Sequence, residues 1–242
     1  MTDAIDLQTT EPFTIPIDAL MLIDPTNLSM PAVSQMGWDV LRKIHKWPAL
    51  VPIDGQALAE VFQGEVNLTV FANCLRTTDT GTLLIRGDHL ERYWVTLDRA
   101  TGEEGWLDKA RYLSMAGESE KAQHHRQERL GFQEVANMQL ERRLNCACMP
   151  EGVFLGHTVN YLCNFKGNRY YILVILNSKL LNWRFKTTST NNHVSGDEVR
   201  ALPIRRINFT TPQQERERLA AEAKRLYYEG LEKAGLNGGD RK

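Results

Sequence analysis

The chain has 242 residues, 42% of them hydrophobic and 24% charged, and its formal net charge at pH 7 is -1. This is the composition of an ordinary soluble globular protein with one core, and the apolar runs are too short to span a bilayer. Residues 1–70 hold three Lys and Arg against nine Asp and Glu, whereas residues 165–206 hold eight against two. The second segment predicts a basic surface that could face phosphate. Ordinary solvated faces of a helix and a strand are the equally weighted alternative.

The N-terminal part predicts a polar start followed by one helix. Residues 1–12 are polar and have no periodicity, so we expect them to be disordered. Residues 24–27, Asp-Pro-Thr-Asn, are typical of a turn. Between Ser34 and Lys46 the apolar residues have helical spacing, and Pro48 would end that helix.

Residues 61–165 predict most of the β structure. Val66, Leu68 and Val70 alternate with polar residues, and a second strand-like run follows a polar turn. Residues 99–120 predict a loop around a short helix. Further strands are expected at about 131–135 and as a pair within 145–165. The predicted fold is α+β, with a mixed, mostly antiparallel twisted sheet, a few packed helices and a C-terminal helix.

Residues 170–204 join an apolar stripe, a polar segment and a short apolar exit. Residues 172–176 alone could form a buried strand, but the helical pattern continues and favours one helix over 170–186. Residues 187–193, TTSTNNH, predict an ordered polar loop. The apolar pattern then resumes up to Ile204 and predicts a strand end at a sheet edge, because Pro203 lacks a backbone N–H.

The C-terminal segment predicts a helix with defined ends. Thr211 is a candidate N-cap, Pro212 would be the first helical residue, and Gln214 would complete a capping box. Gly235 would end the helix. Its apolar stripe must pack on something, either on its own domain or on another helix or subunit.

Reactive groups do not form a recognisable catalytic pattern. The sequence contains neither a glycine-rich nucleotide loop nor a Gly-x-Ser-x-Gly elbow. Cys146 and Cys148 lack zinc-site spacing, so the four cysteines are expected to be free thiols in a reducing cytoplasm. The adjacent His124 and His125 would point to different faces and are not expected to bind a metal. We therefore expect no catalytic centre and no metal in this chain, with a divergent nuclease as a remote alternative.

Three stretches carry a family resemblance. They are LIRG at 84–87, VFLGHTVNY at 153–161, and LNSKLLNWRFK at 176–186 followed by STNNHVSGDEVRALPI at 189–204. In this order they resemble the C-terminal target-recognition (specificity) domain of TaqI-like and type IIG adenine-N6 DNA methyltransferases of restriction-modification systems. The specificity subunits of type I restriction systems show a related pattern. Arg205 stands where these proteins often have a second proline.

The resemblance implies a non-catalytic chain that reads double-stranded DNA for an adenine methyltransferase domain or subunit. S-adenosylmethionine would be bound by the catalytic part of the parent enzyme, not by this chain. Residues 13–206 would form the DNA target-recognition domain, and residues 207–242 a helix for packing, subunit contact or self-association. The alternative is an interaction subunit that docks a methyltransferase or self-associates through helices, without direct readout of DNA.

Candidate DNA contacts follow from this implication and from the basic segment. The expected phosphate contacts are Arg142, Arg143, Lys166, Arg169, Lys179, Arg184 and Lys186. The expected polar contacts to bases are Arg86, His89, Ser189, Asn191, Asn192 and His193. For residues 189–193 the structural alternative is that the loop caps the preceding helix and that other loops read the bases.

Overall fold

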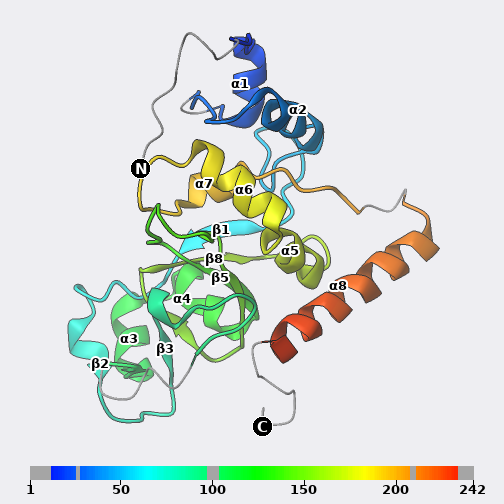
Figure 1. Cartoon of the computed structure of the whole chain (residues 1–242). Helices are drawn as coiled ribbons and strands as arrows, with labels where there is room; N and C mark the ends of the chain where they lie inside the picture. Colours follow the sequence, from blue (N-terminus) through cyan, green and yellow to red (C-terminus); the bar gives the residue numbers. More distant parts are fainter. Residues whose placement is uncertain (1–11, 26–27, 97–103, 208–210, 234–242) are drawn as a thin grey trace.

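The computed structural model describes residues 12–25, 28–96, 104–207 and 211–233 (Figure 1). Its centre is an antiparallel sheet of four strands in the order β1-β8-β5-β6. The strands are β1 (Glu60–Gln63), β5 (Arg129–Gln133), β6 (Cys146–Met149) and β8 (Val159–Cys163). Every residue of β8 is buried, because it lies between β1 and β5 and both of its faces are covered. The α+β prediction is confirmed, as are the strand regions near 131–135 and within 145–165.

Smaller elements pack at one end of this sheet. β2 (Leu75–Arg76) pairs antiparallel with β4 (Trp106–Leu107), and β3 (Leu84–Ile85) pairs parallel with β7 (Phe154–Leu155). The short helical pieces nearby are η1 (Ala72–Cys74), η2 (Gly87–His89), α3 (Lys109–Ala116), α4 (Glu120–Gln123) and η4 (His124–Arg126). The short helix expected within 99–120 is α3. A buried ion pair of 2.7 Å between Arg129 and Glu65 ties this end to β5.

The alternating strand predicted over residues 66–70 is wrong. Val66 forms only an isolated bridge to Gly156, and the chain then turns. Asn67 causes the turn, because its side-chain Oδ1 accepts hydrogen bonds from the backbone N–H groups of Thr69 and Val70. Such a local bond gives the backbone an alternative to a strand ladder.

The single helix predicted over residues 170–186 is two helices, α5 (Arg169–Leu176) and α6 (Lys179–Thr188). The break lies at Asn177, which is fully buried and exchanges two side-chain hydrogen bonds of 2.7 and 3.0 Å with the backbone of Cys146 in β6. Ser178 then caps α6 by accepting a hydrogen bond from the N–H of Leu181. A long-range contact therefore overrides a continuous helical pattern.

The strand predicted after the polar loop is also wrong, because residues 196–200 form helix α7 (Gly196–Arg200). Ser195 and Glu198 make a reciprocal capping box at its start. Strand-like pairing survives only as isolated bridges, from His193 to Val135 and from Pro203 to Ala49. The Ser-x-x-Glu spacing was the sequence signal for this helix.

Two helices form the N-terminal end of the molecule, opposite α3 and β2 in Figure 1. They are α1 (Ile17–Ile23) and α2 (Gln35–Ile44). The predicted helix at 34–46 is confirmed as α2, with Ser34 as its N-cap and Trp38 and Leu41 buried. Trp183 of α6 packs against the same cluster. The disorder expected for residues 1–12 falls almost entirely outside the described residues, as does the second half of the turn at 24–27.

The C-terminal helix is α8 (Gln213–Lys233), which packs against α5. Its first main-chain hydrogen bond runs from Arg216 N to Pro212 O, so Pro212 takes the cap position expected for Thr211. Ala223 and Tyr227 of α8 are buried, and the Tyr227 ring lies 5.1 Å from that of Tyr170. The apolar stripe is therefore used within this chain. The helix end expected at Gly235 lies outside the described residues.

Candidate nucleic-acid interface

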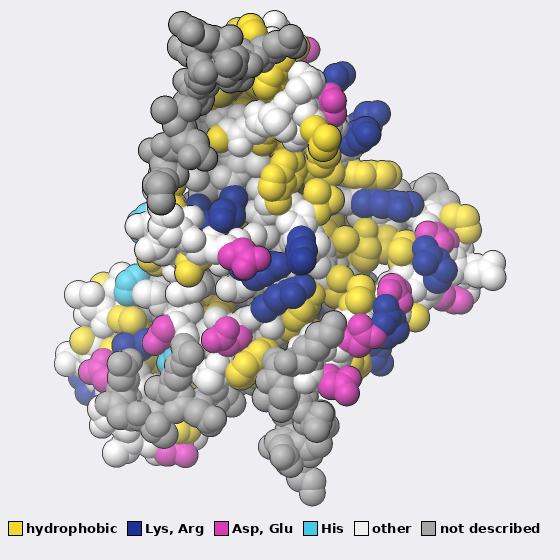
Figure 2. Space-filling view, viewed as in Figure 1, with side chains coloured by type: hydrophobic (Ala, Val, Ile, Leu, Met, Phe, Trp, Pro, Cys, Tyr) yellow, Lys and Arg dark blue, Asp and Glu magenta, His cyan; other side chains and the backbone are white. Residues whose placement is uncertain are grey.

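A continuous surface forms where the segment 137–142 runs beside α6. Asn182 of α6 donates to the carbonyl of Glu141 at 3.0 Å and accepts from the N–H of Arg143 at 2.9 Å. Nζ of Lys186 donates to the carbonyl of Leu140 at 2.8 Å. We call residues 137–142, the exposed side of α6 and the loop 189–193 the α6 surface. In Figure 2, Lys and Arg side chains gather near the middle of the face shown, over α5 and α6.

The loop 189–193 at one end of the α6 surface is held from inside by Arg143. This side chain is only 2% exposed, and its guanidinium donates to the carbonyls of Ala136, Asn191 and His193 at 3.2, 2.5 and 3.1 Å. It also lies 5.1 Å from the centre of the Phe185 ring. Burial lowers the pKa of Arg143. Arg143 therefore orders the loop from within and lies too deep to meet a phosphate in this conformation.

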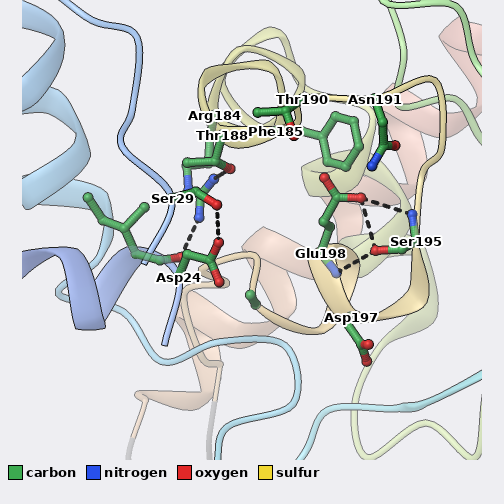
Figure 3. Close-up of a pocket in the computed structure, with 12 residues that line it drawn as sticks. Asp24, Ser29, Arg184, Phe185, Thr188, Thr190, Asn191, Ser195, Asp197 and Glu198 are labelled. Atoms are coloured by element: carbon green, nitrogen blue, oxygen red, sulfur yellow. Dashed lines mark hydrogen bonds between the residues drawn. The ribbon is translucent and has the colours of Figure 1, made fainter. Parts of the chain in front are cut away.

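Arg184 is likewise an internal residue, which joins α6 to the N-terminal helices. Its guanidinium donates to Nε2 of His45 at 2.6 Å, to Oγ1 of Thr188 at 2.9 Å and to the carbonyl of Ile23 at 2.6 Å. Burial lowers its pKa to about 10. Figure 3 shows Arg184 in the wall of a polar pocket that is also lined by Asp24, Asp197 and Glu198. The volume of this pocket is about 410 Å³. The expected phosphate contact of Arg184 thus has no exposed group to make it.

The loop itself presents three polar side chains to solvent. Asn191, Asn192 and His193 are exposed. Each asparagine uses Oδ1 internally, accepting from the N–H of His193 at 2.7 Å or of Met138 at 2.9 Å. The Nδ2 groups and the His193 ring make no hydrogen bond within the described chain. They can therefore bond a ligand from a backbone that is already ordered. Ser189, in contrast, is buried.

The remaining predicted contacts divide between the α6 surface and other places. Lys179 and Lys186 are exposed on α6. Arg142 lies at the other end of segment 137–142 and is half-buried. Three residues lie off this surface and have other roles or surroundings. Arg169 pairs with Glu128, Arg86 pairs with Glu104 at 3.3 Å, and Lys166 is exposed beside a hollow shared with Arg206 and Arg216.

His89 is another predicted contact that the structure places inside. It is 2% exposed, and its Nδ1 accepts a hydrogen bond of 3.2 Å from the backbone N–H of Arg86. This bond completes the first turn of η2. His89 therefore shapes the chain after β3 and has no ring edge at the surface.

Arg92 is not among the residues predicted from the sequence, and its side chain lies beside that of Arg142 at the end of α5. Nη2 of Arg92 and Nη1 of Arg142 both donate to the carbonyl oxygen of Asn177, at 3.0 and 3.1 Å. Burial and the charge of Arg92 lower the pKa of Arg142. The two charges repel each other, and solvent and salt weaken this repulsion because Arg92 is exposed. No motif marks Arg92, because a fold contact alone brings it to Arg142.

No family model matches the sequence, and no curated protein matches it. Within the described ranges, none of the helices is both long enough and apolar enough to cross a membrane. The same residues contain no group of three or more His, Cys, Asp or Glu side chains arranged to hold a metal ion. The four cysteines are free thiols, and burial raises the pKa of Cys163 to about 12.

Proposed function

We propose that the chain is a DNA target-recognition module that reads a specific duplex sequence through the α6 surface. The observation that carries this proposal is the loop 189–193, whose backbone Arg143 fixes from inside while Asn191, Asn192 and His193 project outward. Preorganised polar side chains can bond base edges without first ordering a loop. Asparagine and histidine donors suit the acceptors of purines in the major groove.

The dimensions and charge of the α6 surface support the same function. α6 has ten residues and is therefore about 15 Å long, and the major groove, which is about 12 Å wide, admits the diameter of an α-helix, about 10–12 Å. Lys179 and Lys186 lie on it, and Arg142 lies at the end away from the reading loop. Phosphate contacts at these positions would fix the register of the loop on the duplex.

The catalytic step belongs to another polypeptide or domain in this proposal. The chain would position the duplex while an adenine methyltransferase that binds S-adenosylmethionine takes the target base out of the stack. The alternative, an interaction subunit acting through helices, gains no support from α8, because Ala223 and Tyr227 already pack against α5.

Titration of labelled duplex DNA of mixed sequence at low and moderate salt tests the proposal. Binding should weaken steeply with salt, because phosphate contacts release counterions. The variant Lys179→Ala/Lys186→Ala should lose at least tenfold in affinity. The control Lys109→Ala/Lys224→Ala removes two exposed lysines from α3 and α8 and should bind like the unaltered chain. Equal affinity of both double variants would refute the assignment of the α6 surface.

A further inference from the structure

Arg92 and Arg142 have a surplus of positive charge that the fold does not neutralise. They share the carbonyl oxygen of Asn177, so their donating nitrogens are at most about 6 Å apart. That carbonyl is the C-cap of α5, where the helix dipole supplies about half a negative charge. Within the residues that the structure describes, no carboxylate forms an ion pair with either guanidinium. The α5 dipole and the charge of the neighbouring Glu141 offset the two guanidinium charges only in part, so the net charge at this point of the surface is positive.

The free donors of the pair suit a tetrahedral oxyanion. Arg92 uses only Nη2, which also donates to the Tyr93 hydroxyl at 3.2 Å, and Arg142 uses only Nη1. Their other N–H groups have no partner in the described chain and are not buried. Hydrogen bonds from guanidinium to phosphate are about 2.7–2.9 Å long. Because both guanidinium groups bond the same carbonyl oxygen, they lie close enough for free N–H groups of each to reach one phosphate.

The backbone next to Arg92 has an unfavourable conformation. Tyr93 has φ of 79°, which is rare for a residue with a side chain. The N–H of Tyr93 donates to the carbonyl of Cys146 and its carbonyl accepts from the N–H of Cys148, both in β6, and α8 covers its ring at Gly230. α6 begins at Lys179, two residues after Asn177. The positive end of the α6 dipole and Lys179 therefore both lie near the break between α5 and α6.

We propose that Arg92 and Arg142 form a binding site for a single phosphate group. This deepens the proposed function and rests on it for the source of the phosphate, which is the DNA backbone next to the sequence read by the loop 189–193. A free phosphate or a phosphomonoester has the same chemistry and is the other source. The pair acts as one clamp, so both arginines serve the same phosphate.

The test is the salt dependence of duplex binding by the full chain and by Arg92→Gln, Arg142→Gln and the double variant. Glutamine keeps a polar side chain with an amide donor and removes the charge, and Arg92→Lys keeps the charge. Loss of one phosphate contact should make the negative slope of log K against log salt concentration shallower by about 0.9. Near 0.1 M salt this corresponds to a loss of roughly tenfold in affinity. Each single variant and the double variant should show the same loss, and Arg92→Lys should restore most of it. Circular dichroism and thermal midpoints confirm that each variant is folded.

Other outcomes separate this site from the proposed function. If the Arg92→Gln and Arg142→Gln slopes equal that of the unaltered chain while Lys179→Ala/Lys186→Ala loses affinity, the clamp is wrong and DNA reading stands. Additive losses in the double variant would also overturn a shared phosphate.

If the unaltered chain binds no DNA, the proposed function fails, and titration with inorganic phosphate tests the phosphate site by itself. In NMR spectra, phosphate should shift the Nε–H resonances of Arg92 and Arg142 in a saturable way. Each shift should disappear when the other arginine is replaced by Gln, and unchanged spectra would overturn a site for free phosphate.

Discussion

Nε of Arg184 donates a hydrogen bond of 2.6 Å to Nε2 of His45, and this bond joins α6 to the residue that ends α2. A guanidinium only donates, so the His45 ring must accept at Nε2 and remain neutral. Burial and the charge of Arg184 lower the pKa of His45 from 6.5 to about 3. The contact between the N-terminal helices and the α6 surface therefore depends on a neutral histidine.

The chain should lose stability as the pH falls from about 6.5 towards 3. In that range the unfolded chain protonates His45 and the folded chain does not, so protons favour unfolding. Between pH 6.5 and pH 5 His45 should account for about 1 to 2 kcal/mol of this loss, and the buried His125, whose pKa burial also lowers, should add to it. Urea unfolding at the two pH values measures it. His45→Gln keeps an acceptor but does not titrate, so its pH dependence should be smaller by that amount.

The exposed His193 provides the control for this effect. His193→Gln should keep the full pH dependence of the unaltered chain, because His193 makes no buried contact with its ring. If His45→Gln and His193→Gln unfold with the same pH dependence, His45 does not control acid stability.

Arg143→Ala should destabilise the fold and release the loop 189–193. The substitution leaves the carbonyls of Ala136, Asn191 and His193 without their buried donor. The expected loss is about 3 kcal/mol, since an unsatisfied buried group costs about 1–3 kcal/mol and solvent will reach some of these carbonyls. Chemical unfolding gives the energy, and hydrogen exchange should become faster across residues 189–194. Arg126→Ala, at an exposed position, is the matched control and should change neither quantity.

Gly230→Ala should weaken the docking of α8, against the usual trend for helices. Alanine normally stabilises a helix interior by about 1 kcal/mol relative to glycine. Here a Cβ atom would lie 2.5 Å from Cδ2 of the buried Tyr93 ring. The overlap should give a net loss of about 1–3 kcal/mol and faster proteolysis within α8. A higher thermal midpoint for this variant would mean that α8 does not press on Tyr93.

Periodic patterns predicted the parts of the fold that local sequence determines. α2, α8 and the strands β5, β6 and β8 were found because their apolar spacing and end signals agree with their structure. The break between α5 and α6 was missed because it depends on Asn177 bonding Cys146, 31 residues away. Local pattern carries no information on such a bond.

Burial was hardest to predict from the sequence for arginine. Arg143 and Arg184 look like surface cations in the sequence, yet carbonyls from distant segments draw them into the interior. Arg92 looks ordinary and becomes prominent only because the carbonyl of Asn177 brings it to Arg142. The exposed positions Lys179, Lys186 and residues 191–193 were the part that charge and polarity could predict.

The measurement that tests the central claim most directly is selection of bound duplexes from a pool with a randomised central segment, using the full chain at moderate salt. We predict enrichment of one sequence motif. The variant Asn191→Ala/Asn192→Ala should lose or change that motif while keeping most of the salt-dependent affinity, because Lys179 and Lys186, the proposed phosphate contacts, are intact. Binding without enrichment of any motif, or an identical motif in the variant, would contradict readout by the loop 189–193.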